Sequence, residues 1–167
     1  MKRIVKVIII LSLLAPVCNA QVTETEYAAF YDSIVPRLKL VEKEANNYTG
    51  KPISEFVKFL AKYNVKIIEI WVTYYDNQKL YPQEVYGVTM FFDDQRDFAR
   101  EHNLWRPCIA IYFKGSNPYE KAMDLSKKYE RHFAKEVEEF YSDVVIKSMG
   151  FYFESNTGLS YKKQKDK

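Results

Sequence analysis

The sequence predicts an α+β domain in which helices pack on a twisted, mostly antiparallel sheet of four strands. Segments with apolar residues at every third or fourth position alternate with segments rich in β-branched and aromatic residues, in the order ααββαβαβ. Hairpin and crossover connections both occur in this order, which favours a two-layer arrangement. A parallel pair is compatible with the last crossover, and the order does not determine how the strands neighbour one another.

The first twenty residues predict a secretory signal. Residues 2–6 include three positive charges, residues 7–17 are apolar apart from Ser12, and Cys18 and Ala20 provide the small residues of an A-x-A-like cleavage site. The apolar run is about half of the ~20 residues that a membrane-spanning helix needs. We therefore expect cleavage after Ala20, a mature chain that is periplasmic or extracellular, and no transmembrane segment in it. Lipidation at Cys18 is the alternative, although the preceding residues lack the leucine of a lipobox.

The rest of the chain predicts one α+β domain over residues 21–154 and a flexible polar tail over residues 155–167. The leader holds three of the 25 lysine and arginine residues and none of the 22 aspartate and glutamate residues, so 22 of each remain. Because this balance lacks the basic excess of a nucleic-acid-binding domain, we expect no nucleic-acid partner. Cys108 is the one cysteine after the leader, so an internal disulfide is excluded.

Two helices are expected before the first strand. Residues 23–47 place aromatic and aliphatic side chains three or four positions apart, with Glu24 and Glu26 in the first turn. Pro36 is expected to kink or split this helix. A turn then leads to a short second helix, over residues 52–64.

Three strands and a brief helix are expected next. Residues 65–75 and 85–92 are rich in β-branched and aromatic side chains, and the polar stretch between them predicts a hairpin with a long loop. Residues 93–103 predict a brief helix, and residues 108–114 predict the third strand.

The longest helix is expected to follow the third strand. Asn117 is a suitable N-cap, Pro118 fits the first helical position, and Glu120 is placed to complete a capping box. Apolar residues then recur at helical spacing as far as Phe140. Residues 143–154 predict the fourth strand.

Aromatic residues around the predicted hairpin form the candidate binding site: Trp71, Tyr74, Tyr75, Tyr81 and Tyr86. Rings next to polar groups can stack on a sugar or hold an extended peptide. Tyrosine is also common in strands, and cross-strand packing accounts for many such rings without a ligand.

Cys108 is an alternative candidate, as a nucleophile with His102 or His132 as its base. An imidazole can help a thiol to form the reactive thiolate, so this pattern is compatible with a cell-envelope cysteine hydrolase. The position of Cys108 at the start of an apolar strand favours a buried, inert thiol instead.

Motifs for metals and cofactors are weak or missing. The acidic segment 93–97 offers carboxylates, yet it lacks the glycine and the spacing of a calcium loop, and acidic residues are expected at the start of a helix. The sequence shows no zinc-binding histidine pair, no G-x-S-x-G elbow and no glycine-rich cofactor loop. We therefore expect no metal and no cofactor.

Three segments resemble small exported proteins of unknown function from Bacteroidales: GKPISEF at residues 50–56, the strand over residues 67–75, and YGVTMFF at residues 86–92. The likeness spans about residues 50–114. It implies the periplasm or the surface of a Gram-negative cell, and it transfers no catalytic residues.

The first hypothesis is an exported, non-catalytic module that binds a protein or a glycan of the cell envelope. The binding surface would be one face of the sheet or the hairpin between Tyr74 and Tyr86. The cysteine hydrolase and a structural subunit of an envelope complex are the alternatives.

Overall fold

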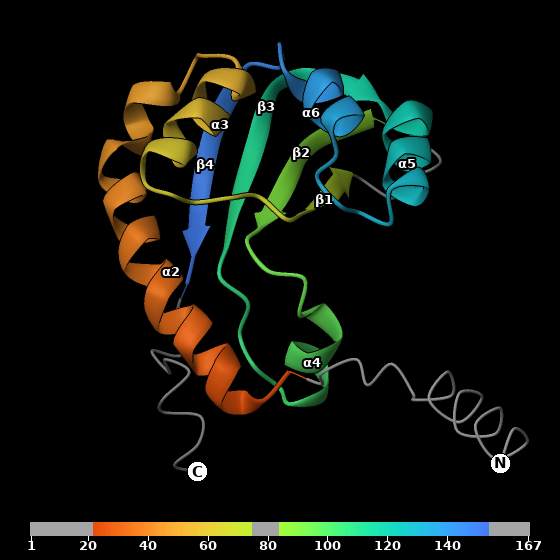
Figure 1. Ribbon diagram of the computed structural model, residues 1–167. Helices are drawn as coiled ribbons and strands as arrows, with labels where there is room; N and C mark the ends of the chain where they lie inside the picture. The colour runs from red at the N-terminus through yellow and green to blue at the C-terminus, as the bar shows by residue number, and fades with distance from the viewer. Residues whose placement is uncertain (1–21, 75–83, 154–167) are drawn as a thin grey trace, which may run out of the picture.

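The structure, a computed structural model, describes residues 22–74 and 84–153 of the chain (Figure 1). The predicted leader and the predicted polar tail lie outside the described residues. Within the described residues, no helix has the length and apolar character needed to cross a bilayer. The elements in chain order are α2 (Glu24–Glu44), the 3₁₀ helix η1 (Ala45–Tyr48), α3 (Ile53–Lys62), β1 (Glu69–Tyr74), β2 (Glu84–Phe91), α4 (Arg96–Glu101), β3 (Cys108–Pro118), α5 (Tyr119–Lys128), α6 (Lys135–Tyr141) and β4 (Ile146–Tyr152).

The four strands form an open sheet in the order β1-β2-β3-β4. Every neighbouring pair is antiparallel, including β3 and β4, so the parallel pair that the last crossover allowed does not form. The predicted pairing of the first two strands is confirmed, with Ile70 opposite Met90. The predicted fold class, an α+β domain with a four-stranded antiparallel sheet, is confirmed.

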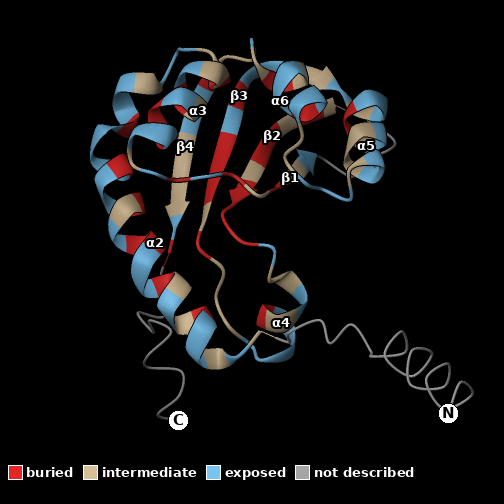
Figure 2. Ribbon diagram, viewed as in Figure 1, coloured by how far each residue is buried: buried red, intermediate tan, exposed pale blue. Residues whose placement is uncertain are grey.

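One face of the sheet carries the core. Side chains opposite each other in an antiparallel pair point to the same face, so Ile70, Met90 and Ile109 form a row, with Val88 and Ile111 in the next. All five are at most 3 % exposed. Helices α3 and α6 lie in front of this sheet in Figure 1, and buried residues concentrate along β2 and β3 in Figure 2.

The opposite face, called the outer face below, is more open. Trp71, Thr89, Ala110 and Gly150 occupy one row across the four strands, and Tyr112 in the next row is 40 % exposed. At one end of this face the chain leaves β2, forms α4 and returns to β3. Figure 1 shows α4 beyond the end of the strands, close to the start of α2.

The single long helix predicted from Pro118 onward is wrong. The segment forms α5 and α6, and between them Glu130 and Arg131 have φ angles of 49° and 71°. The break occurs because this stretch binds the edge of β1: Ile70 N donates to the carbonyl of Arg131 over 2.8 Å, and Phe133 N donates to the carbonyl of Ile68 over 2.8 Å. Hydrogen bonds to the sheet therefore replace those of a continuous helix.

The predicted helix caps in the same region also need correction. Asn117 and Pro118 belong to the end of β3, opposite Val85 and Glu84. Pro118 is the N-cap of α5 and makes no side-chain capping bond. The third strand is therefore longer than predicted because β2 offers pairing partners as far as Glu84.

The first helix starts as predicted and is not split. Thr23 is the N-cap of α2, and its side chain and that of Glu26 form a reciprocal capping box. The helix continues through Pro36 to Glu44. Leu38 and Val41 in its second half are fully buried, so packing on the core favours a continuous helix at this position.

Candidate functional site

A cleft of about 670 Å³ opens at the end of the outer face that lies next to α4. Its volume falls within the range typical of small-ligand sites, roughly 300 to 1,000 Å³. Strands, α4, the segment that leads into β3 and the α5–α6 connection all contribute. The lining residues are Trp71, Phe91, Arg96, Ala99, Arg100, Leu104, Trp105, Arg106, Cys108 and Arg131, and we call this site the arginine cleft.

Apolar side chains from the sheet form one wall of the arginine cleft. The Trp71 and Phe91 rings lie 5.1 Å apart between centroids, and Cys108 stands opposite Phe91 on the next strand. Leu104 and Trp105 add apolar surface from the segment that follows α4. This wall suits the apolar C–H face of a ligand that also carries polar groups.

Arg106 is held rigidly in the cleft by two carboxylates. Its side chain is 9 % exposed, its Nε lies 3.0 Å from Oδ1 of Asp93, and its Nη2 lies 3.1 Å from Oε2 of Glu69. Nη2 also donates to the carbonyl oxygen of Asp93 over 2.9 Å. The guanidinium lies 4.2 Å from the centroid of the Phe91 ring. These contacts fix the orientation of Arg106 before any ligand arrives.

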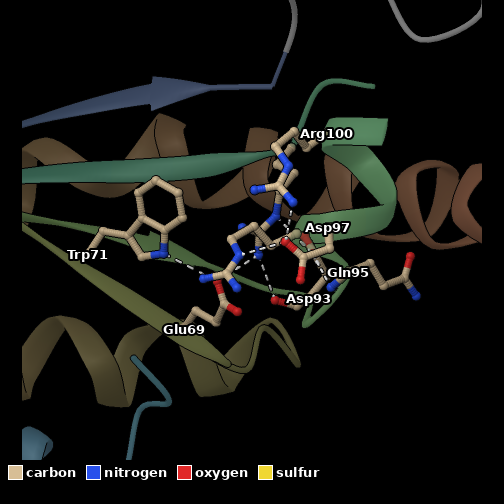
Figure 3. Close-up of polar contacts among 8 residues, drawn as sticks. Glu69, Trp71, Asp93, Gln95, Asp97 and Arg100 are labelled. Atoms are coloured by element: carbon tan, nitrogen blue, oxygen red, sulfur yellow. Dashed lines mark hydrogen bonds and ion pairs between the residues drawn. The ribbon is translucent and has the colours of Figure 1, made fainter. Parts of the chain in front are cut away.

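Glu69 also connects Trp71 of the apolar wall to this network. Nε1 of Trp71 donates to Oε2 of Glu69 over 3.3 Å, as Figure 3 shows. Burial raises the pKa of Asp93, while Arg106 and the N–H of Gln95 oppose that rise. The acidic segment 93–97 thus contributes Asp93 to an ion pair, and no cluster of metal-ligating side chains occurs in the described part of the chain.

The other three arginines differ in their partners. Arg96 and Arg100 lie 3.3 Å and 3.2 Å from Oδ1 of Asp97, and the hydrogen bond from Arg96 lowers the pKa of that carboxyl. Arg131 lies over the indole of Trp71, with 4.9 Å between its guanidinium carbon and the ring centroid. Among the described residues, no carboxylate lies within 4.0 Å of Arg131.

Two residues that line the cleft each carry a buried donor without an acceptor among the described residues. Nη1 of Arg106 and Nε1 of Trp105 are buried, and neither has a hydrogen-bond partner in residues 22–74 and 84–153. Most buried polar groups in folded proteins are paired, so unpaired ones in a cleft indicate where a ligand can bind.

The predicted position of Cys108 at the start of a strand is confirmed, and this residue lines the cleft. Burial raises the pKa of this thiol to about 11. His102 stacks on Phe98, with ring centroids 4.3 Å apart. The backbone of His132 forms an isolated antiparallel β-bridge with Glu69 at the edge of the sheet. His102 forms an ion pair with Glu24, and no hydrogen bond between Cys108 and either imidazole is found among the described residues.

The structure describes three of the five aromatic residues predicted as a binding site, and it places them in different surroundings. Trp71 lines the arginine cleft, whereas Tyr74 packs against Tyr119 of α5, with ring centroids 5.0 Å apart. Tyr86 is partly buried in β2. Tyr75 and Tyr81 lie outside the described residues.

The sequence reasoning missed the four arginines. They are spread from Arg96 to Arg131 and come together through the fold, so no local pattern marks all of them. The spacing of Arg96 and Arg100 was an available signal, since residues four apart on a helix lie on one face.

Comparisons of this chain with protein-family models, with curated proteins and with solved structures give no match.

Proposed function

We propose that this chain is an exported, non-catalytic binding protein of the cell envelope, and that its ligand is a glycan bound in the arginine cleft. The observation that carries the proposal is the combination of an apolar wall, built on Trp71, with arginine donors in a single concave site. Sugars present both apolar C–H faces and many hydrogen-bonding groups, so such a lining suits them.

A small or chain-like ligand fits this site better than a protein partner. Protein interfaces of standard size cover about 800 Å² on each side and are broad rather than deep. The cleft instead concentrates its polar groups in one hollow of about 670 Å³. Export is part of the proposal because the leader at residues 1–20 has the composition of a secretory signal.

The state of Cys108 supports binding over hydrolysis. With a thiol pKa of about 11, very little thiolate is present at neutral pH, and the thiolate is the nucleophilic form. The cysteine therefore serves as part of the apolar wall.

Titration of the mature chain with a panel of neutral and acidic oligosaccharides tests this function. We expect Trp71→Ala to weaken the binding of the recognised oligosaccharide by about 10-fold or more, a change of ~1.4 kcal/mol. Tyr112→Ala is the matched control, because Tyr112 is an exposed aromatic residue on the same face outside the cleft. Equal weakening by both variants, or no binding to any member of the panel, contradicts the proposal.

A further inference from the structure

We infer that the glycan is acidic, and that a carboxylate or sulfate group on one of its sugars binds to Arg131 and Arg106 in the arginine cleft. This inference rests on the proposed function, and it adds the chemical class of the ligand. Guanidinium groups bind such oxyanions through charge-assisted, often bidentate hydrogen bonds.

The charge distribution favours an anion. The lining of the cleft contains four arginines and no aspartate or glutamate. Arg96 and Arg100 share Asp97, and Arg106 binds Glu69 and Asp93. Arg131 has no carboxylate within ion-pair distance in the described part of the chain, so its charge is available to a ligand.

Buried donors give a second and independent indication. The side chain of Arg106 is nine-tenths buried, and its Nη1 has no acceptor among the described residues. Nε1 of Trp105 is likewise buried and has no acceptor in the described part of the chain. Both groups can only donate, so a ligand that reaches them must bring acceptor oxygens, as an oxyanion does.

Both arginines are positioned before binding. The carboxylates of Glu69 and Asp93 fix the guanidinium of Arg106. The backbone of Arg131 is in the left-handed region, with φ at 71°, and its carbonyl accepts a hydrogen bond from Ile70 at the sheet edge. Non-glycine residues adopt this conformation rarely, and such positions concentrate at ligand-binding sites.

The surroundings of Arg131 also determine on which side the anion binds. A neighbouring hollow of about 580 Å³ shares Arg96 and Arg131 with the cleft, but three carboxylates line it together with Lys127, namely those of Glu69, Asp94 and Glu130. Those carboxylates repel an anion, whereas the cleft side has none in its lining. The acidic group therefore binds on the cleft side of Arg131.

Two matched pairs of oligosaccharides test the inference by calorimetric titration of the mature chain. Tetragalacturonate is compared with its fully methyl-esterified form, and a sulfated galactan tetrasaccharide is compared with its desulfated form. We expect the charged member of one pair to bind at least about 10-fold more tightly than its neutral partner, the effect of one or two charge-assisted hydrogen bonds. The pair that shows the difference identifies carboxylate or sulfate as the source of the charge.

Variants locate the charge effect at one residue. Arg131→Met is expected to remove most of the preference for the charged member and to leave the affinity for the neutral member unchanged. Arg131→Lys is expected to keep part of the preference, because it keeps the charge and loses the planar fork. Arg37→Met is the matched control, since Arg37 is a partly exposed arginine of α2 outside the cleft that donates to Ser33 and to the carbonyl of Asn64.

The outcomes separate this inference from the proposed function. Equal affinity for charged and neutral members overturns the acidic ligand, whereas a preference that survives Arg131→Met overturns the binding of its charge by Arg131. Either result leaves glycan binding standing. Absence of binding to all four probes and to the wider panel overturns both.

Discussion

Substitution of Arg106 by methionine is expected to destabilise the fold strongly at neutral pH. The variant keeps the bulk of the side chain and leaves Glu69 and Asp93, whose side chains are 7 % and 1 % exposed, without their shared cation. Removing one partner of a buried ion pair costs about 3–5 kcal/mol. The free energy of unfolding of a domain of ordinary size is ~5–15 kcal/mol, so this loss is a large share of it.

Urea denaturation followed by circular dichroism measures this loss. With a slope of about 2 kcal/mol per molar urea, typical of small domains, the midpoint of unfolding should fall by ~2 M. Arg96→Met is the matched control, because Arg96 binds Asp97 at the exposed surface and its loss should leave the midpoint almost unchanged. The triple variant Arg106→Met, Glu69→Gln, Asp93→Asn should recover much of the loss, since no buried charge remains unpaired.

The same variant should show a defined pH dependence. Burial already raises the pKa of Asp93, and Arg106 is the main group that opposes this rise, so its removal raises that pKa further. A carboxyl with a raised pKa in the folded state contributes stability below its unfolded pKa, about 3.9, and loses that contribution as pH increases. The deficit of Arg106→Met should therefore be small near pH 4 and grow toward pH 7. A deficit below about 1 kcal/mol at pH 7, or no recovery in the triple variant, refutes the reasoning.

Three further predictions concern the sheet. Gly87→Ala should destabilise the fold by about 1–3 kcal/mol, because the new Cβ would lie 2.5 Å from the backbone oxygen of Ile111, and urea denaturation measures this. Gly150→Ala should cost less than ~1 kcal/mol, because its closest neighbour is the ring of Tyr152, a side chain that can rotate; equal losses for the two variants would contradict this difference. Alkylation of Cys108 by iodoacetamide in the folded protein should reach half of its maximal rate near pH 11 instead of the usual 9, and a midpoint at 9 would show that the thiol is not desolvated.

Local patterns in the sequence predicted the elements of the sheet well. Each of the four strands is marked by its own run of β-branched and aromatic residues, and the capping box at Thr23 marks the start of α2. The division between α5 and α6 was not predictable in this way. It depends on the hydrogen bond from Phe133 to Ile68 and the one from Ile70 to Arg131, each between residues that are distant in the sequence. The apolar spacing across the break continues as if the helix did.

The candidate site was predicted in small part. Trp71 was identified because it is an aromatic residue in a strand, and it does line the cleft. Arg106 gained its role from Glu69 and Asp93, which lie 37 and 13 residues away in the sequence. Pairs at such separations leave no periodic signal, so a single sequence gives no basis for connecting them.

The placement of Trp71 and Trp105 has a practical consequence. These are the two tryptophans of the whole chain, and both line the arginine cleft. Native indole emission therefore originates at the proposed binding site itself. Filling the cleft changes the polarity around both indoles, so occupancy can be followed in unmodified protein by fluorescence, with no label or engineered reporter.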